Sequence, residues 1–279
     1  MASLVNGTSK PRAGKHHFVY PNFNLQGKVY IVTGAGRGLG LCIAEAMTEA
    51  GAEVHCLDRL PEPYPDFIET QELAEKSHIG SLHYHHVDVR NSKFLNDTIN
   101  KIASREHRLD GLVAAAGVQQ VTEAIDYAPE DVTRMMDINY TGVFMTAQAV
   151  ARRMIELNNH GSIILVASMS GLIANKGLNS VVYNSSKAAV IQLAKNLAME
   201  WGPKGIRVNS LSPGHIITPM VQKNFEEVPG LKETWEKENM LGRLAHPEEF
   251  TGAAIFMLSE ASSFMTGSSL VIDGGHTAW

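Results

Sequence analysis

Residues 28–40 read Lys-Val-Tyr-Ile-Val-Thr-Gly-Ala-Gly-Arg-Gly-Leu-Gly, and this stretch decides the fold. The short apolar run 28–33 is typical of a strand that is covered on both faces. The glycines after it allow a sharp turn and a close approach of the backbone to a pyrophosphate. A helix predicted over 39–50 would direct its unpaired amides and the positive end of its dipole at that anion. The stretch therefore predicts a dinucleotide site at a strand-to-helix junction.

An acidic residue about 20 positions beyond the glycines supports this interpretation, since a glycine-rich loop alone can be just a flexible turn. This residue is Asp58, which follows the next predicted strand. A carboxylate there can accept hydrogen bonds from the adenosine ribose and would repel a 2′-phosphate, which favours NAD. Arg37 and Arg59 could instead pair with a 2′-phosphate, or be ordinary surface arginines. We expect NAD to be the favoured cofactor, with NADP as the alternative.

The rest of the chain repeats the alternation of strand and helix. Further strands are predicted over 53–57, 82–87, 111–116, 162–167, 206–211 and 268–272, and further helices over 67–76, 92–104, 129–158, 183–201 and 247–259. Strands separated by helices of this length are joined by parallel, right-handed crossovers. The sequence thus predicts one doubly wound α/β sheet of about seven strands with helices on both faces. The polar stretch 214–243 interrupts the alternation and is interpreted as a substrate lid or as a surface helix pair.

Composition and charge exclude several classes of protein. The chain has 279 residues and a formal net charge of −5 without runs of basic residues, so we expect no nucleic-acid or membrane partner. No apolar run approaches the roughly 20 residues of a membrane span. The two cysteines, Cys42 and Cys56, fit a reduced core better than a disulfide framework. We interpret residues 1–24 as an N-terminal extension and expect a cytoplasmic protein.

Tyr183 and Lys187 lie four positions apart at the start of the helix predicted over 183–201, so their side chains share one face. A tyrosine, with its usual pKa near 10, is a poor proton shuttle at neutral pH. A nearby lysine cation, together with an oxidised nicotinamide, favours the phenolate and lowers that pKa. The spacing alone is common on surface helices. Ser168 makes it more specific, because it ends a predicted strand at the sheet edge where ligands bind.

From about Leu25 to its C-terminus the chain resembles the short-chain dehydrogenase/reductase family. The matching motifs occur in order along the chain: residues 33–40, Asp88-Val89, Asn139 within 137–142, Ser168, Tyr183 with Lys187, Pro213-Gly214 followed by Thr218, and Asp273-Gly274-Gly275. The resemblance implies a single Rossmann-like domain over 25–279 with strand order 3-2-1-4-5-6-7. It also implies reversible, nicotinamide-dependent oxidation of a secondary alcohol to a ketone.

The resemblance further implies a catalytic set of four residues. Tyr183 would give or take the proton at the substrate oxygen, and Ser168 would orient that oxygen. Lys187 would lower the tyrosine pKa and hold the nicotinamide ribose, while Asn139 would support a water that relays protons. The expected cofactor-binding set is Gly34, Gly36, Arg37, Gly38, Leu39, Gly40, Asp58, Arg59, Asp88, Val89, Ala116, Gly117, Asn139, Tyr183, Lys187, Pro213, Gly214, Ile216, Ile217 and Thr218.

Two departures from the family pattern concern the site. Residues 114–117 read Ala-Ala-Ala-Gly where the family usually has Asn-Asn-Ala-Gly, so we expect a small local loss of hydrogen bonds. Ser168 and Tyr183 are 15 positions apart, somewhat more than is usual. The loop 172–182, which would border the substrate, is therefore expected to be enlarged.

The two ends of the predicted domain suggest a substrate class. Residues 19–23 and 273–279 resemble fungal polyol dehydrogenases and ketose reductases of the arabinitol and sorbose types. A reductase of a less polar ketone in secondary metabolism is the alternative, favoured if Met169, Met220 and Trp279 line the pocket. A non-catalytic dinucleotide-binding regulator is a third interpretation, against which the intact catalytic set argues. The residues expected to touch substrate are Ser168, Met169 and His215.

Twelve histidines raise the question of a metal site. His83 and His85 would share one face of a strand, but that strand is expected at the sheet edge, where polar residues are ordinary. A ligand set needs more convergent partners, so we expect no metal. The resemblance also implies pairing of the helices over 129–158 and 183–201 across subunits, and thus a homotetramer or homodimer.

Overall fold

The computed structural model describes residues 22–279, except for the side chains of Pro219, Met220 and Lys223. Its seven strands are β1 (Val29–Thr33), β2 (Glu53–Asp58), β3 (Ser81–His86), β4 (Gly111–Ala114), β5 (Gly161–Val166), β6 (Ile206–Pro213) and β7 (Ser269–Ile272). They form one parallel sheet in the order β3-β2-β1-β4-β5-β6-β7. The predicted fold class and strand order are confirmed.

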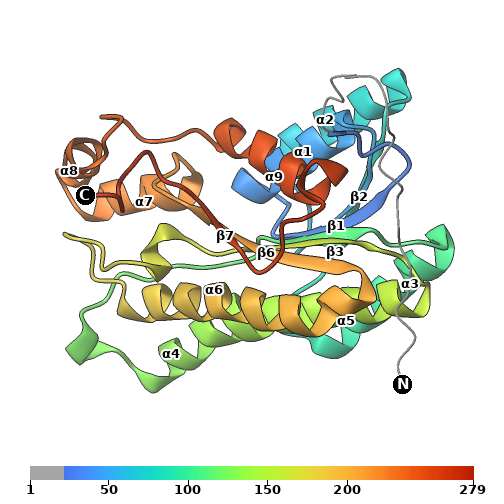
Figure 1. Ribbon diagram of the computed structural model, residues 1–279. Coiled ribbons are helices and arrows are strands. Elements are labelled where there is room, and N and C mark those ends of the chain that lie inside the picture. Colours follow the sequence, from blue (N-terminus) through green and yellow to red (C-terminus); the bar gives the residue numbers. More distant parts are fainter. Residues whose placement is uncertain (1–21) are drawn as a thin grey trace, which may run out of the picture.

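Helices cover both faces of this sheet (Figure 1). On one face lie α1 (Gly38–Glu49), α2 (Pro65–Ser77) and α9 (Thr251–Leu258); on the other lie α3 (Ser92–Glu106), α4 (Pro129–Met136), α5 (Val143–Glu156) and α6 (Val181–Trp201). Each layer buries its own apolar core against the sheet. The central strand β1 is fully buried, as a strand covered on both faces requires.

Strand β1 shows how the two cores divide the side chains of the sheet. Ile31 points into the core beneath α3, α5 and α6, whereas Tyr30 and Val32 point into the core beneath α1 and α9. The same alternation places Leu57 of β2 on the side of α3. Strand β3 is an edge strand, as predicted, with His83 opposite His55 and His85 opposite Leu57 in β2.

The helix predicted over 129–158 is divided into three parts. Between α4 and α5 the chain makes a π-helical turn over Asp137–Gly142. Such a turn accommodates an extra residue, and it directs the side chain of Asn139 into the protein, where it is fully buried. The two buried residues of this turn, Asn139 and Gly142, are not hydrophobic, so the hydrophobic pattern did not reveal it.

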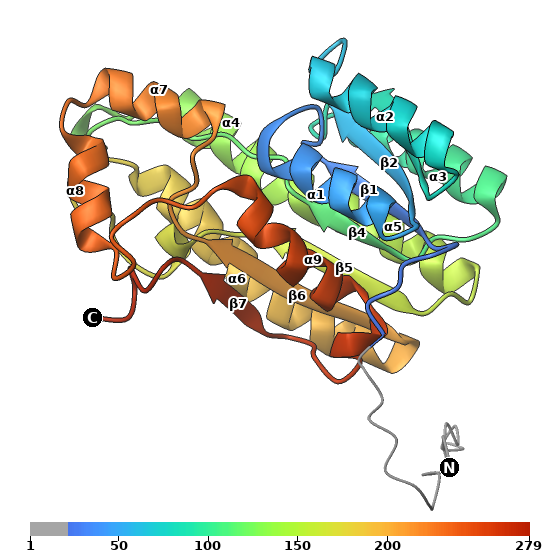
Figure 2. The same cartoon turned by 90° about the horizontal axis from the view of Figure 1, so that it is seen from above.

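The stretch expected to be a lid or a helix pair contains two short helices, α7 (Pro219–Glu227) and α8 (Leu231–Glu238). They lie together beyond one end of the sheet (Figure 2). Trp235 of α8 packs with Leu178, Leu231 and Leu244 in a small separate core. The structure shows the helix pair, and closure over a substrate stays a prediction.

The start of the described chain is held by Leu25, which is fully buried and whose amide donates to the Ala50 carbonyl over 3.1 Å. The N-terminal extension predicted for residues 1–24 falls mainly on 1–21, outside the described residues, so the division into extension and domain stays a prediction. Cys42 and Cys56 are both free thiols. Among the described helices, none combines the length and the apolarity that crossing a membrane requires.

Candidate active site

Two glycines, one in the loop between β1 and α1 and one in the first turn of α1, have no room for a side chain. Gly34 has a φ of +69°, and a Cβ atom there would lie 2.7 Å from the Cα atom of Ala116. At Gly40 a Cβ atom would overlap the carbonyl oxygen of Gly34. Helix α1 begins at Gly38 without a side chain that caps its amides, and Leu39 packs on the core behind it. A close-packed loop with free helix amides is the donor set that a diphosphate needs, so the residues fit a dinucleotide.

Asp58 lies beside this loop, as predicted. Its Oδ2 atom accepts a hydrogen bond of 2.9 Å from the Gly36 amide, and its Oδ1 atom accepts one of 3.1 Å from the Leu60 amide. Arg37 donates to the Tyr64 hydroxyl over 2.9 Å and its guanidinium lies 5.6 Å from the centre of that ring. Arg59 is exposed. The carboxylate is therefore fixed at the loop, whereas Arg37 is engaged by Tyr64 and Arg59 is exposed.

Asp88 has a partner that the sequence analysis did not consider. Arg90 donates to both of its carboxylate oxygens, with Nε 3.0 Å from Oδ1 and Nη2 2.5 Å from Oδ2. These hydrogen bonds lower the pKa of Asp88 below its usual value. Val89 is buried, and its side chain fills the space where Gly142 has none. A cofactor bound at this position would thus meet an ion pair, not a free carboxylate.

Tyr183, Lys187 and Ser168 converge at the carboxyl end of β5. Lys187 is only 4% exposed, donates to the Val166 carbonyl over 2.8 Å, and places its Nζ atom 5.7 Å from the centre of the Tyr183 ring. Ser168 acts on the Tyr183 side chain by lowering its pKa, and its Oγ atom accepts a hydrogen bond of 3.1 Å from the Ser170 amide. The predicted proton-transfer group is assembled by the fold.

The pKa of Tyr183 differs from the expectation. Burial raises the pKa of Tyr183, and the Ser168 side chain opposes this in part. Burial also lowers the pKa of Lys187 to about 8. In the chain by itself, loss of solvation therefore dominates both pKa values. The positive charge of an oxidised nicotinamide, when bound, would favour the phenolate.

Asn139 is held firmly behind this group. Its Oδ1 atom accepts from the Val118 amide over 2.9 Å, while Nδ2 donates to the Val118 carbonyl over 2.9 Å and to Ser186 Oγ over 3.0 Å. A Cβ atom at Gly117 would lie 3.5 Å from both Asn139 Oδ1 and Lys187 Nζ. The side chain of Asn139 therefore fixes the loop after β4 beside the lysine, and the relay water stays a prediction.

The last of the predicted cofactor-binding residues follow β6. Pro213 ends that strand, and a Cβ atom at Gly214 would lie 2.6 Å from the Cα atom of Asp273. Ile216 pairs with Ala245 as in a parallel bridge, and the Ile217 amide donates to the Ala245 carbonyl over 2.8 Å. Thr218 caps helix α7 by accepting from the Val221 amide over 3.4 Å. Ala116, another predicted cofactor-binding residue, follows β4, and its amide donates to Thr33 Oγ1 at the end of β1 over 3.3 Å.

His215 contacts two aromatic residues that sequence reasoning missed. Its ring stacks on Trp235 at a centroid distance of 3.6 Å and meets the edge of His276 at 5.1 Å. Burial, helped by His276, lowers the pKa of His215 to about 3. Its Nε2 atom is buried without a hydrogen-bond partner among the described residues. Nothing in the sequence pattern connects these three positions.

The residues named for an apolar pocket do not lie together on one exposed wall. Met169 is buried, with 1% of its surface exposed, whereas Trp279 is 77% exposed and donates to the Glu238 carbonyl over 3.0 Å. The side chain of Met220 lies outside the described part of the chain. The loop expected to be enlarged instead lines a pocket of about 360 Å³ beside the start of α6. Its walls are formed by Thr122, Ala124, Ile173, Ala174, Asn175, Leu178, Asn179, Ser180, Val181, Asn184 and Ser185.

Comparison with known proteins places this architecture in a family. A family model described as enoyl-(acyl carrier protein) reductase matches residues 34–277. The chain is 41% identical over 262 residues to the short chain dehydrogenases/reductase notP' of Aspergillus versicolor, covering 92% of this chain and 89% of that protein. It is 36% identical over 271 residues to the ribulose-forming D-arabinitol 2-dehydrogenase of Candida albicans (strain WO-1), covering 94% and 96%.

Solved structures of dehydrogenases share the fold of this chain. A gluconate 5-dehydrogenase from Burkholderia cenocepacia J2315, in complex with NADP and tartrate, superposes with a TM-score of 0.81 at 32% identity, over 92% of this chain and 98% of that one. The chain thus belongs to the short-chain dehydrogenase/reductase family, as a nicotinamide-dependent oxidoreductase that interconverts secondary alcohols and ketones.

Proposed function

We propose that the protein oxidises a secondary hydroxyl group of a sugar alcohol to a ketose, and reduces the ketose in the reverse direction, with NAD(H) as its favoured cofactor. The observation that supports this most is the convergence of Ser168, Tyr183 and buried Lys187 at the carboxyl end of β5. Relatives named D-arabinitol 2-dehydrogenase, galactitol 2-dehydrogenase and sorbose reductase suggest the substrate class.

Each member of the group has a task that its contacts support. Ser168 and Tyr183 would hold the reacting oxygen between their hydroxyls, and Tyr183 would take its proton during oxidation or return it during reduction. Lys187, fixed by the Val166 carbonyl, would stabilise the phenolate that results. The nicotinamide, when bound, supplies or accepts the hydride.

The preference for NAD rests on Asp58. Its carboxylate is already fixed by two backbone amides at the loop, where it can receive ribose hydroxyls and repel a 2′-phosphate. Arg37 is engaged by Tyr64, so it would have to leave that contact to bind a phosphate. Relatives differ on this point: one is named an NADH-dependent L-xylulose reductase, while the gluconate dehydrogenase structure contains NADP.

His215 supports a polar substrate. Its buried Nε2 atom lacks a partner among the described residues, and a low pKa keeps its imidazole neutral at pH 7. A neutral imidazole can accept or donate a hydrogen bond to a polyol hydroxyl. The apolar cluster of Leu178, Leu231, Trp235 and Leu244 favours the alternative, a reductase of a less polar ketone.

A panel of substrates distinguishes a polyol dehydrogenase from a reductase of less polar ketones. Pentitols, hexitols, ketoses and apolar ketones should be assayed by nicotinamide absorbance with NAD(H) and with NADP(H). We expect turnover of a polyol with NAD and of the matching ketose with NADH. Inert polyols and ketoses together with reactive apolar ketones would replace our proposal by the alternative.

We also propose a homotetramer, or a homodimer, that pairs through α5 and α6. Three apolar side chains of these helices are exposed: Ile155 (38%), Val181 (48%) and Met199 (70%). Light scattering after gel filtration measures the assembly, and a monomer at micromolar concentration contradicts it. A cytoplasmic location agrees with the two free thiols, and cell fractionation tests it.

A further inference from the structure

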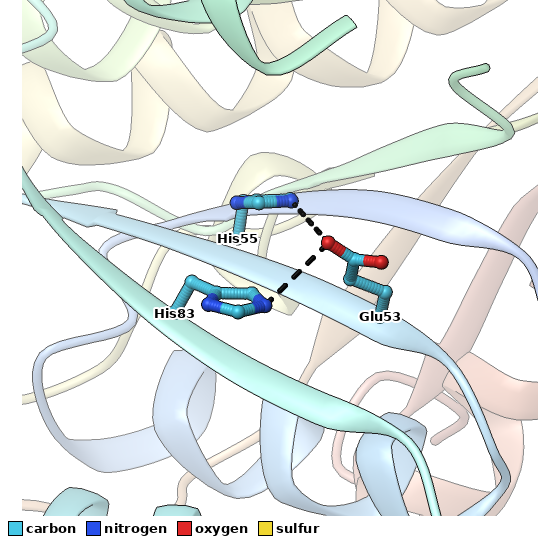
Figure 3. A group of neighbouring side chains, drawn as sticks. All are labelled: Glu53, His55 and His83. Atoms are coloured by element: carbon cyan, nitrogen blue, oxygen red, sulfur yellow. Dashed lines mark hydrogen bonds and ion pairs between the residues drawn. The ribbon is translucent and has the colours of Figure 1, made fainter. Parts of the chain in front are cut away.

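Polar side chains of β2 and β3 gather on the face of the sheet that α3 covers. Glu53 and His55 stand two positions apart on β2, and His83 is the register partner of His55 on β3 (Figure 3). Glu53 Oε1 lies 3.2 Å from His55 Nε2 and 3.5 Å from His83 Nε2. The sequence shows two histidines on one face of an edge strand, and the pairing of the strands adds a buried histidine and a carboxylate.

The three atoms are spaced like metal ligands. In a tetrahedral zinc site with bonds of about 2.0–2.1 Å, neighbouring ligand atoms stand about 3.3 Å apart. Two of the separations are already near this value, and all three ligand atoms lie within 4.8 Å of one another. Small side-chain rotations would therefore place an ion between them. Glu53 and His83 have side-chain exposures of 27% and 37%, which leaves a side open for a water ligand.

His85 gives the cluster an outer contact. Its Nε2 atom lies 3.0 Å from His55 Nδ1. When this contact is a hydrogen bond from His55 Nδ1–H, the lone pair of His55 Nε2 is directed at Glu53, as in the outer shell of many metal sites. The His55 and His83 rings stack at a centroid distance of 4.8 Å and 18°, which keeps both nitrogens on one side.

Two neighbours compete for the same atoms. Arg105 of α3 places Nη2 3.6 Å from Glu53 Oε1, and Ser81 Oγ lies 3.2 Å from His83 Nε2. Arg105 is 57% exposed and is also paired with Glu106, so it can leave Glu53 without losing its charge partner. Serine can rotate away at small cost. Neither neighbour blocks the space between the three ligand atoms.

We propose that Glu53, His55 and His83 bind a divalent transition-metal ion of the Zn²⁺ type, with His85 as a positioning residue. Two imidazoles and one carboxylate suit Zn²⁺, whereas Mg²⁺ and Ca²⁺ prefer oxygen ligands. Glu53 and His55 belong to the amino-terminal half of β2, away from Asp58 at the cofactor end of that strand. The ion would tie the edge strand β3 to β2 and would stabilise the folded chain without taking part in the reaction.

Titration and scanning calorimetry on untagged, EDTA-treated protein test this metal site. Zn²⁺ is the ion tested, and Mg²⁺, which prefers oxygen ligands, is the control. We expect one Zn²⁺ per chain and a rise in Tm of about 5 °C or more at a free Zn²⁺ concentration of 100 times Kd. Co²⁺ bound there should give the visible absorption of a tetrahedral nitrogen–oxygen site. Mg²⁺ should produce neither heat nor a shift in Tm.

Variants assign the binding to these residues. His83→Gln and Glu53→Gln should weaken Zn²⁺ binding more than His85→Gln, for which we expect about 10- to 100-fold. His86→Gln is the matched control, because His86 is an exposed histidine of the same strand and contacts the Arg59 carbonyl instead. Circular dichroism establishes that each variant is folded. Binding that survives both His83→Gln and Glu53→Gln, or no binding to the wild type, overturns the proposal.

Discussion

The carboxyl edge of the sheet and the β2–β3 histidine cluster (Glu53, His55, His83 and His85) hold their polar side chains in opposite ways. At the carboxyl edge, backbone groups hold Lys187, Asn139 and Asp58. In the cluster, the side chains mainly contact one another. Backbone contacts fix a geometry before any ligand arrives, as proton and hydride transfer requires. Side-chain contacts can rearrange around an ion, so we expect a reactive site at the first location and a structural one at the second.

Tyr183→Phe should have the largest effect. Removal of the hydroxyl takes away the proton donor and acceptor, so kcat should fall by about 10²- to 10⁴-fold. Cofactor affinity, measured by fluorescence titration, should stay within a few fold, and the rise in Tm with Zn²⁺ should be unchanged. Unchanged turnover removes Tyr183 from the mechanism. Loss of turnover in EDTA-treated wild-type protein would show that the two sites are not independent.

Asp58→Ala should change the choice of cofactor next most strongly. Loss of a charged hydrogen-bond acceptor for the ribose, and of its repulsion of a 2′-phosphate, should lower the ratio of kcat/KM for NAD to that for NADP by about tenfold or more. The comparison is made at one saturating concentration of the best substrate. A ratio that does not move would mean that Asp58 serves the loop alone, through Gly36.

Asn139→Ala tests how strongly backbone contacts stabilise the carboxyl edge. The change leaves the amide and carbonyl of Val118 without their partner, so the free energy of unfolding should fall by about 1–3 kcal/mol. Urea denaturation measures it. Asn196→Ala removes an exposed side-chain contact with Gln192 and should cost less than about 0.5 kcal/mol. Equal losses would refute the special role of the buried amide.

Lys187→Met should change how the stability of the chain depends on pH. The pKa of Lys187 is lowered to about 8 in the folded chain, while the unfolded chain keeps a value near 10.5. Between these values the unfolded state binds more protons, so this residue makes the free energy of unfolding rise with pH. The wild type should therefore gain stability relative to Lys187→Met between pH 8 and pH 10. A constant difference contradicts the shifted pKa.

The sequence predicts the carboxyl edge better than the cluster, and the reason is physical. Gly34, Ser168, Tyr183 and Lys187 stand at fixed spacings next to recognisable strands and helices, so local pattern suffices to place them. The alternation of strand and helix predicted a parallel sheet, and the family resemblance implied its strand order. The π-helical turn at Asp137–Gly142 buries Asn139 and Gly142 instead of hydrophobic residues, and therefore the hydrophobic pattern did not predict it.

The pairing of Asp88 with Arg90 is local, and it competes with the cofactor-binding role that the family resemblance gave to Asp88.

Contacts between distant segments could not be predicted. The stack of His215 on Trp235 joins the end of β6 to α8. The meeting of His83 with Glu53 and His55 depends on strand register, which is set by the whole sheet.

The stack of His215 on Trp235 has an experimental consequence. Trp235 is one of three tryptophans in the chain, and its indole lies face to face with an imidazole at 3.6 Å. Any displacement of α8 away from the end of β6 must separate these two rings. In a chain with Trp201 and Trp279 replaced by Phe, the fluorescence emission of Trp235 would therefore report motion of α8 during turnover.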